Sequence, residues 1–232
     1  MPSHPPTAAE NTPASPTASE PTEQIEALRQ ADSPVGLLMA TRRLAEVCHP
    51  AAAPSLVEVL GFNNPGAAVA AVDGLIALGE QAVEPLLANL DGHNYGARAW
   101  AVRALAGIGD VRGLELLESA LACDIGPSVR RAAARGLGQL RLEGLPQDER
   151  INVRQRCLDA LLAGGGDGEW VVRYAVAVGL EQLLLGMAPV EHGRPAGLKA
   201  LQGLAGEPGD ETAVVRLRAS LALRRLDGGA VG

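Results

Sequence analysis

Apolar residues recur along most of this chain at intervals of three and four residues, the spacing of helices that bury one face. After Arg98, for example, the third, seventh and tenth positions hold Ala101, Leu105 and Ile108, which share one helical face and are expected in the core. The pattern extends from residue 22 to residue 226 and predicts essentially no strand. The sequence therefore predicts an all-α protein.

The helical pattern repeats along the chain. Each copy has a small or branched residue, an arginine, an alanine-rich stretch and a leucine seven residues after the arginine. The pairs are Arg98/Leu105, Arg130/Leu137, Arg173/Leu180 and Arg216/Leu223, and two degenerate earlier copies carry Leu37/Leu44 and Ala68/Leu75. The copies are 30 to 43 residues apart, a period that suits one pair of helices per unit. We therefore expect a HEAT-like α-α superhelix of about six helix pairs, with the concave face as the working surface.

Turn and cap residues place the helices coarsely. Pro34, Pro65 and Pro127 lie at predicted first turns, where a missing backbone N–H costs little, and Gly79 and Gly109 follow predicted inner helices as C-caps. The expected outer helices are 22–31, 51–60, 82–90, 112–122, 149–163 and 196–206, and the expected inner helices are 34–47, 66–78, 95–108, 127–140, 169–186 and 212–226.

An acidic residue precedes the arginine of three units by six positions. The pairs are Asp124/Arg130, Asp167/Arg173 and Asp210/Arg216, and Asp91 lies seven positions before Arg98. This spacing resembles the HEAT-repeat consensus, in which the turn aspartate and the arginine of neighbouring units bond into a ladder. We therefore interpret the three pairs as a structural ladder and not as catalytic groups.

The first 22 residues hold six of the sixteen prolines, and Ser, Thr, Ala and Glu fill most of the rest. Such a stretch cannot bury enough apolar surface to offset the entropy lost on ordering. We therefore expect a disordered tail over residues 1–22, followed by a solenoid over residues 23–228.

Charge and cysteine content exclude several classes of partner. The chain has 20 basic and 27 acidic residues, a formal net charge of −7, and no basic run, so no nucleic-acid partner is expected. No apolar run approaches the roughly 18 residues of a membrane span, and no secretory signal begins the chain, so we expect a cytoplasmic protein without a membrane partner. Cys48, Cys123 and Cys157 lack a metal-binding spacing and are interpreted as reduced thiols, with no metal site.

Five positions after the repeat arginine, the inner helices leave the core face. Read along the stack, this position holds Arg42, Asp73, Arg103, Arg135, Val178 and Leu221. Trp100 lies three residues before Arg103, and His93 and Tyr95 lie at the start of the same helix. Arginine forks match carboxylates and aromatic faces stack on conjugated rings, so this cluster suits a planar, conjugated ligand that carries carboxylates. The alternative is a solvated polar face with one tryptophan packed between repeats.

Four segments resemble the cyanobacterial E/F-type phycobilin lyases. They are residues 61–75 (GFNNPGAAVAAVDGL), 90–105 (LDGHNYGARAWAVRAL), 128–138 (SVRRAAARGLG) and 169–175 (EWVVRYA). The resemblance covers residues 25 to 226, is strongest to the F subunit of the phycocyanin α-subunit lyase, and excludes the proline-rich tail. Relatives that also isomerise the bilin carry a His-Cys pair in the segment corresponding to His93-Asn94-Tyr95. This chain has no His-Cys dipeptide, so the resemblance does not imply isomerase activity.

The resemblance implies a heterodimer with an E-type subunit, which binds phycocyanobilin and attaches it through a thioether to one cysteine of the phycocyanin α subunit. Phycocyanobilin is then the substrate, and no cofactor is implied. Arg103, Arg135, Trp100, Tyr95 and His93 become candidate substrate-binding residues. Asp73 becomes the candidate catalytic residue, because its carboxylate could stabilise the protonated, more electrophilic bilin.

Two further hypotheses come from other functional classes. One is a binding protein that handles bilins or aids phycobilisome degradation without ligating a chromophore, and the other is a generic scaffold. Detection of covalent bilin on the acceptor protein discriminates the lyase from both.

Overall fold

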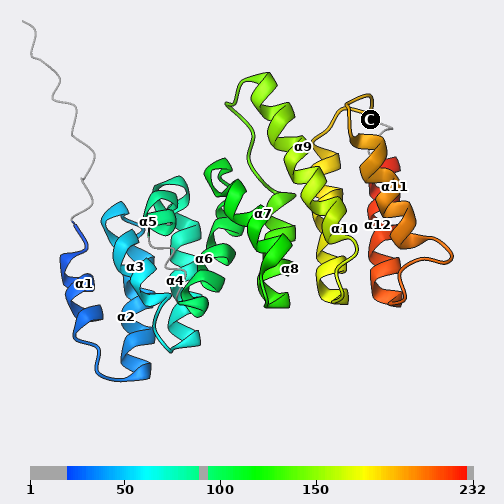
Figure 1. Cartoon of the computed structure of the whole chain (residues 1–232). Helices are drawn as coiled ribbons and strands as arrows, with labels where there is room; N and C mark the ends of the chain where they lie inside the picture. Colours follow the sequence, from blue (N-terminus) through cyan, green and yellow to red (C-terminus); the bar gives the residue numbers. More distant parts are fainter. Residues whose placement is uncertain (1–19, 89–93, 229–232) are drawn as a thin grey trace, which may run out of the picture.

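The structure is a computed structural model that describes residues 20–88 and 94–228, a curved stack of antiparallel helices (Figure 1). Most of the predicted tail, together with His93 and Asp91, lies outside these residues. The outer helices are α1 (Thr22–Arg29), α3 (Ala53–Val59), α5 (Val83–Ala88), α7 (Leu114–Cys123), α9 (Gln147–Gly164) and α11 (Arg194–Ala205). The inner helices are α2 (Pro34–Val47), α4 (Pro65–Leu78), α6 (Tyr95–Ile108), α8 (Pro127–Leu137), α10 (Trp170–Leu185) and α12 (Ala213–Gly228). Within these ranges there is no strand, which confirms the all-α prediction.

Short 3-10 turns precede three of the outer helices. They are η1 (Pro50–Ala52), η2 (Gly79–Ala82) and η3 (Val111–Gly113). The predicted inner helices 34–47 and 95–108 agree with α2 and α6 to the residue. The predicted helix 127–140 is too long, because α8 ends at Leu137. Gly138 then packs so closely on Gly179 of α10 that a Cβ would meet backbone atoms, and Arg141 N–H bonds Gly109 C=O at 2.7 Å.

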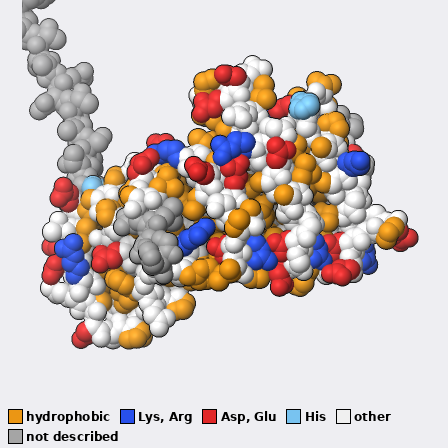
Figure 2. All heavy atoms as spheres, in the orientation of Figure 1, with side chains coloured by type: hydrophobic (Ala, Val, Ile, Leu, Met, Phe, Trp, Pro, Cys, Tyr) orange, Lys and Arg blue, Asp and Glu red, His pale blue; other side chains and the backbone are white. Residues whose placement is uncertain are grey.

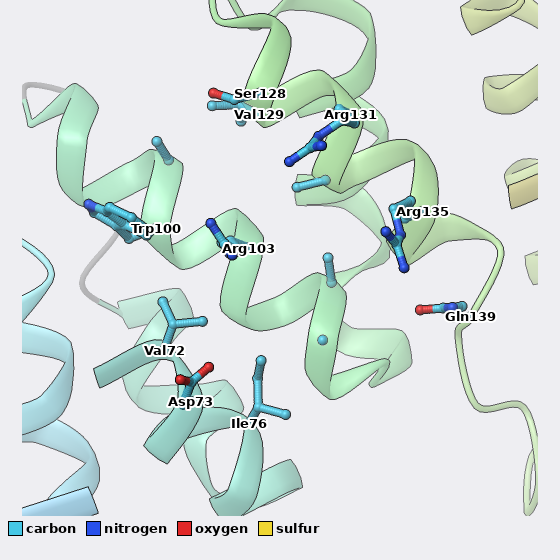
Figure 3. Close-up of a pocket in the computed structure, with 14 residues that line it drawn as sticks. Val72, Asp73, Ile76, Trp100, Arg103, Ser128, Val129, Arg131, Arg135 and Gln139 are labelled. Atoms are coloured by element: carbon cyan, nitrogen blue, oxygen red, sulfur yellow. The ribbon is translucent and has the colours of Figure 1, made fainter. Parts of the chain in front are cut away.

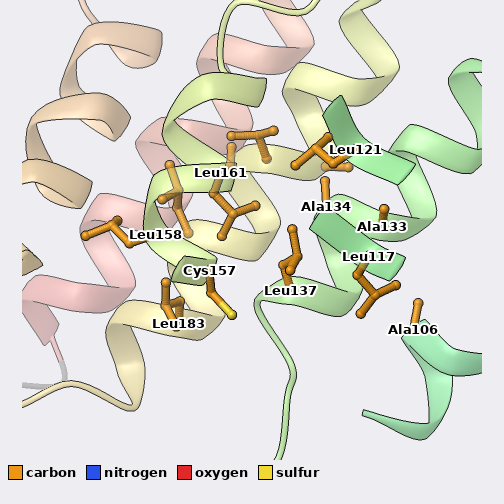
Figure 4. Packing of buried hydrophobic residues seen from close by; sticks show 14 of the residues in the cluster. Ala106, Leu117, Leu121, Ala133, Ala134, Leu137, Cys157, Leu158, Leu161 and Leu183 are labelled. Carbon is orange, nitrogen blue, oxygen red and sulfur yellow. The ribbon is translucent and has the colours of Figure 1, made fainter. Parts of the chain in front are cut away.

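Each inner helix packs mainly on the inner helices before and after it, so consecutive inner helices line one continuous face. Ala101, Leu105 and Ile108 are all buried, as their shared helical face predicts. Leucines interdigitate with alanines between the two layers, as Figure 4 shows around Leu137 and Leu161. The small alanines allow the helix axes to approach closely, at about 8–10 Å.

The core consists of two clusters that meet at α6. One includes Leu105 and extends over α1 to α6, and the other includes Val102 and Ala106 and extends to α12. Helix α6 therefore belongs to both halves of the stack.

One stretch, Pro65–Ala88, is long and apolar enough to cross a membrane by length and composition, which corrects the expectation from the sequence. It combines α4, η2 and α5, and Gly79 interrupts it with a positive φ of 65°. Because 56% of its most apolar window is buried inside the molecule, we interpret it as part of the core.

Candidate functional site

A groove of about 530 Å³ lies on the inner face between α4, α6 and α8 (Figure 3). This volume falls within the range of roughly 300–1,000 Å³ that small-molecule sites occupy. The lining residues are Val72, Asp73 and Ile76 from α4, Ala99, Trp100, Arg103, Ala106 and Gly107 from α6, and Ser128, Val129, Arg131, Ala132, Arg135 and Gln139 from α8 and its end. We call this cavity the central groove.

Four of the residues predicted from the sequence meet in the central groove. Asp73 projects from the α4 side, Arg135 from the α8 side, and Trp100 and Arg103 lie between them on α6. The Arg103 guanidinium lies 5.6 Å from the centre of the Trp100 ring, a cation–π contact that fixes both side chains. The position five residues after the repeat arginine therefore identified one shared face of three consecutive inner helices.

Tyr95 is placed differently from the prediction. It does not line the central groove, because it begins α6 at the edge of the stack, where its hydroxyl donates to Asp124 Oδ1 at 3.1 Å. Partial burial, and next the Asp124 carboxylate, raise the pKa of the Tyr95 hydroxyl. Tyr95 therefore joins two repeats, and among the described residues that line the groove Trp100 is the one aromatic side chain. His93, the remaining predicted contact, lies outside the described residues.

Sequence reasoning missed Arg131 and Gln139. Arg131, Arg135 and Gln139 are spaced four residues apart and lie along the α8 side of the groove (Figure 3). Arg131 directly follows the ladder residue Arg130. It was not considered because the sequence comparison used the position five residues after each repeat arginine, and Arg131 lies one residue after it. The four-residue spacing from Arg135 is the signal that finds it, since residues i and i+4 share a helical face.

The arginines of the groove have no acidic partner in the part of the chain that the structure describes. Within residues 20–88 and 94–228, no carboxylate forms an ion pair with Arg103, Arg131 or Arg135. All three side chains are exposed to the groove or to solvent. Asp73 is the one acidic residue among the described lining residues, so this lining carries an excess of positive charge in a protein of net charge −7. Such a surface favours an anionic ligand.

The ladder arginines differ because each is bonded to its neighbours. Arg130 donates to the Asp167 carboxylate at 2.7 and 2.9 Å and to Asp124 C=O at 2.9 Å. Arg173 donates in the same way to Asp210 and to Asp167 C=O, and Arg216 donates to Asp210 C=O. Figure 2 shows basic and acidic side chains alternating along the lower edge of the molecule, in the region of α8 to α12. The guanidinium hydrogen bonds lower the pKa of Asp167 and of Asp210.

A second cavity of similar volume lies at the C-terminal ends of α4 and α6, beside Gly79, Asp110 and Arg141. Arg112 bonds the Asp110 carboxylate at 2.8 and 2.9 Å and lowers its pKa, and the same guanidinium reaches Glu84 at 3.2 Å. The lining of this cavity carries the carboxylates of Glu80, Asp110 and Glu143 and the guanidinium of Arg141, so it lacks the excess of positive charge of the central groove. No group of three or more His, Cys, Asp or Glu in the described chain could hold a metal ion.

Comparisons with known proteins agree with the fold and add a family. Residues 83–149 match the HEAT-repeat family. The chain is 56% identical over 159 residues to the phycocyanin alpha phycocyanobilin lyase CpcF of Synechocystis sp., covering 68% of this chain and 74% of the relative. It is 48% identical over 209 residues to a phycobilisome maturation protein of Synechococcus elongatus, covering 90% and 99% of the two chains.

Among solved structures, a chain from the complex of CpcE and CpcF of the phycocyanin lyase from Nostoc sp. has a similar fold. It is 42% identical with a TM-score of 0.66, and the match covers 74% of this chain and 98% of that chain. The similarity therefore extends over nearly the whole of the solved chain.

Proposed function

This chain belongs to the family of phycocyanobilin lyase F subunits, also named beta subunits, and on that premise we propose that it is one half of a heterodimeric lyase. The lyase attaches phycocyanobilin through a thioether to a cysteine of the phycocyanin α subunit during phycobilisome assembly. The central groove is the bilin site of this subunit.

The unpaired arginines of the central groove are the observation that carries this proposal. Phycocyanobilin is a linear, conjugated tetrapyrrole with two propionate side chains. The groove offers an indole face at Trp100 and guanidinium groups without acidic partners at Arg103 and Arg135. Bidentate pairing of arginine with carboxylate supplies both charge and orientation, while the tryptophan face suits a flat π-system.

The reaction is an addition, so it requires neither an oxidant nor a leaving group. The acceptor sulfur forms a bond to the exocyclic carbon of the ring A ethylidene group, and the hydrogen of the thiol is also retained by the bilin. The nucleophile belongs to the acceptor protein. The lyase therefore contributes by holding the bilin extended and by bringing the acceptor thiol to it, and such positioning can supply much of the barrier reduction.

Asp73 is the candidate for an electrostatic role in the groove. It lies on the opposite side of the groove from Arg135, and its exposed carboxylate can approach the pyrrole nitrogens of a bound bilin. A negative charge there stabilises the protonated bilin, whose ring A is the better electrophile. Cys157 has no comparable role, because burial raises the pKa of its thiol to about 12.

The partners are an E-type lyase subunit, the phycocyanin α subunit and the bilin, in the cytoplasm and without a cofactor. We assign the E-type contact to the inner face at the end of the stack, where the apolar residues Val178 and Leu221 occupy the position of Arg103 and Arg135. Both are half-buried, and Leu217 beside them is 68% exposed. Apolar side chains that remain accessible on one face are typical of an interface. Size exclusion of the mixed subunits at micromolar concentration tests the assignment, and a chain that remains monomeric beside its partner contradicts it.

The function is tested by coexpression with an E-type partner, the apo α subunit of phycocyanin and a source of bilin. Zinc fluorescence of the denatured α subunit reports covalent chromophore. We expect fluorescence that disappears when either lyase subunit is omitted. Tight bilin binding without any covalent product would favour the non-ligating alternative, in which the protein handles bilins or aids degradation.

A further inference from the structure

Two of the unpaired arginines lie on one helix, one turn apart. Arg131 and Arg135 are four residues apart on α8, so their Cα atoms are separated by about 6 Å along the helix axis. Figure 3 shows both guanidinium groups on the groove side of α8. Arg103 differs from this pair because its guanidinium already stacks on Trp100. The α8 pair is therefore the part of the groove best arranged to bind two neighbouring carboxylates.

A bilin offers two carboxylates in such an arrangement. Its propionates are attached to rings B and C, on either side of the central methine bridge. When these two rings lie side by side in the same orientation, both propionates leave from one edge and both pyrrole nitrogens face the opposite edge. A pair of cations on one wall and an anion on the opposite wall match these two edges.

Besides Trp100 and Arg103, α6 contributes small residues to the floor between the walls. Ala99, Ala106 and Gly107 contribute to the surface of α6 in the groove, and a Cβ on Gly107 would lie 2.4 Å from Ile76 Cδ1. Helices α4 and α8 flank α6 on either side, so their axes are separated by on the order of 16–20 Å. This geometry leaves room for a flat ligand between the arginines of α8 and Asp73 of α4.

Resting on the proposed function, we infer that α8 binds the propionate edge of the bilin through Arg131 and Arg135, one carboxylate to each guanidinium. The long axis of the bilin then runs along α8 and not across the stack, and the pyrrole nitrogens face Asp73. Gln139, four residues beyond Arg135, lies where its amide can bond the lactam of a terminal ring. Arg131 is thus a substrate-binding residue that the repeat position shared by Asp73, Arg103 and Arg135 does not include.

The test uses the complex with the E-type partner, titrated with phycocyanobilin and, separately, with its dimethyl ester. The variants are Arg131→Gln and Arg135→Gln. The control is Arg42→Gln, an exposed arginine at the equivalent repeat position of α2 that does not line the groove. We expect each α8 variant to bind the free acid about tenfold or more weakly, and the control to bind it as the wild type does. The ester should bind weakly to the wild type, with no further loss in either α8 variant.

Several outcomes overturn the inference. If the wild type binds the ester as tightly as the acid, the propionates are not paired with arginines. If Arg131→Gln binds the acid as the wild type does, or loses acid and ester equally, α8 does not hold the propionate edge. Thermal melting of each variant identifies a loss of fold. The proposed function is judged separately, because it fails only if the wild-type complex does not transfer the bilin to the α subunit.

Discussion

Arg130 and Arg131 are neighbours in α8, yet they belong to two different regions of the molecule. One residue corresponds to about 100° of helical rotation, so Arg130 points to the edge of the stack and Arg131 to the central groove. Arg130 is bonded to Asp167 and to a backbone carbonyl, whereas Arg131 is exposed and no carboxylate of the described chain pairs with it. A guanidinium that is already bonded within the fold contributes to stability, and one left unpaired beside a cavity is available for a ligand.

The edge itself also divides into two halves. Asn64 caps α4 by accepting from Ala67 N–H and donates to Pro34 C=O of the preceding unit. Asn94 caps α6 in the same way and donates to Gly61 C=O. From α8 onward the units are joined by the Asp–Arg ladder and no longer by these neutral amide bonds. The hydrogen bond from Tyr95 to Asp124 lies between the two kinds of link.

The largest expected effect is the loss of a ladder arginine. Replacing Arg173 by Ala leaves Asp210, with 2% of its side chain exposed, without its charged partner. Removing one partner of a buried pair costs about 3 kcal/mol or more, so the melting temperature should fall by several degrees. Thermal denaturation followed by circular dichroism measures it. Arg131→Ala is the matched control and should melt as the wild type does.

A smaller effect, on activity alone, is expected in the groove. Arg103→Ala or Arg135→Ala should weaken bilin transfer while helicity and melting stay nearly unchanged. Arg135 loses a charge-assisted bond to the ligand, which costs about 1.5–3 kcal/mol, and Arg103 loses the cation that lies over Trp100 in the groove. Zinc fluorescence of the acceptor measures transfer. In the control, Arg130→Ala should lower the melting temperature first and activity only as a consequence. Early melting of the groove variants, with Arg130→Ala losing only transfer, would show that the division between groove and ladder is wrong.

The neutral links should contribute less than the ladder. Asn64→Ala removes both an N-cap and a bond to the preceding unit, for a loss of about 1 kcal/mol. Urea denaturation measures this change in the free energy of unfolding. Asn63→Ala, at the exposed neighbouring position, should have little effect. Equal losses at the two positions would argue against a specific role for the Asn64 link.

The smallest effect should follow mild acidification. The pKa values of Asp167 and Asp210 are lowered in the folded protein, so their contribution to stability is complete above the unfolded value of about 3.8 and is lost as the pH falls toward the folded values. Between pH 7 and pH 4 only the beginning of this loss is expected. Hydrogen exchange should show faster opening in α10 and α12 than at pH 7, with α2 and α4 changing less. Equal changes in both halves would contradict the contrast between ionic and amide links.

Much of this arrangement could be predicted from spacing. Helical periodicity fixes which residues share a face, so Asp73, Arg103 and Arg135 could be grouped before their contacts were known. Tyr95 shows where spacing is insufficient, because its position at the first turn of α6 brings its hydroxyl to the turn of the next unit. A contact of that kind depends on how two units pack.

The end of α8 gives a second example of this limit. Local preference allows the helix to continue to residue 140, but the close contact between Gly138 and Gly179 depends on the position of α10. Arg131 was missed for a different reason. Its spacing from Arg135 was present in the sequence, but only the structure shows that both face the same cavity.

The meeting of two cores at α6 has a mechanical consequence. The Asp73 wall is built on the first cluster through α4, while the arginine wall is built on the second through α8. Bending of the stack about α6 would change the distance between the two walls, while each core cluster would keep its own packing. The curvature of the stack and the width of the groove are therefore coupled. A protein that binds along the inner face and changes this curvature would also narrow or widen the groove.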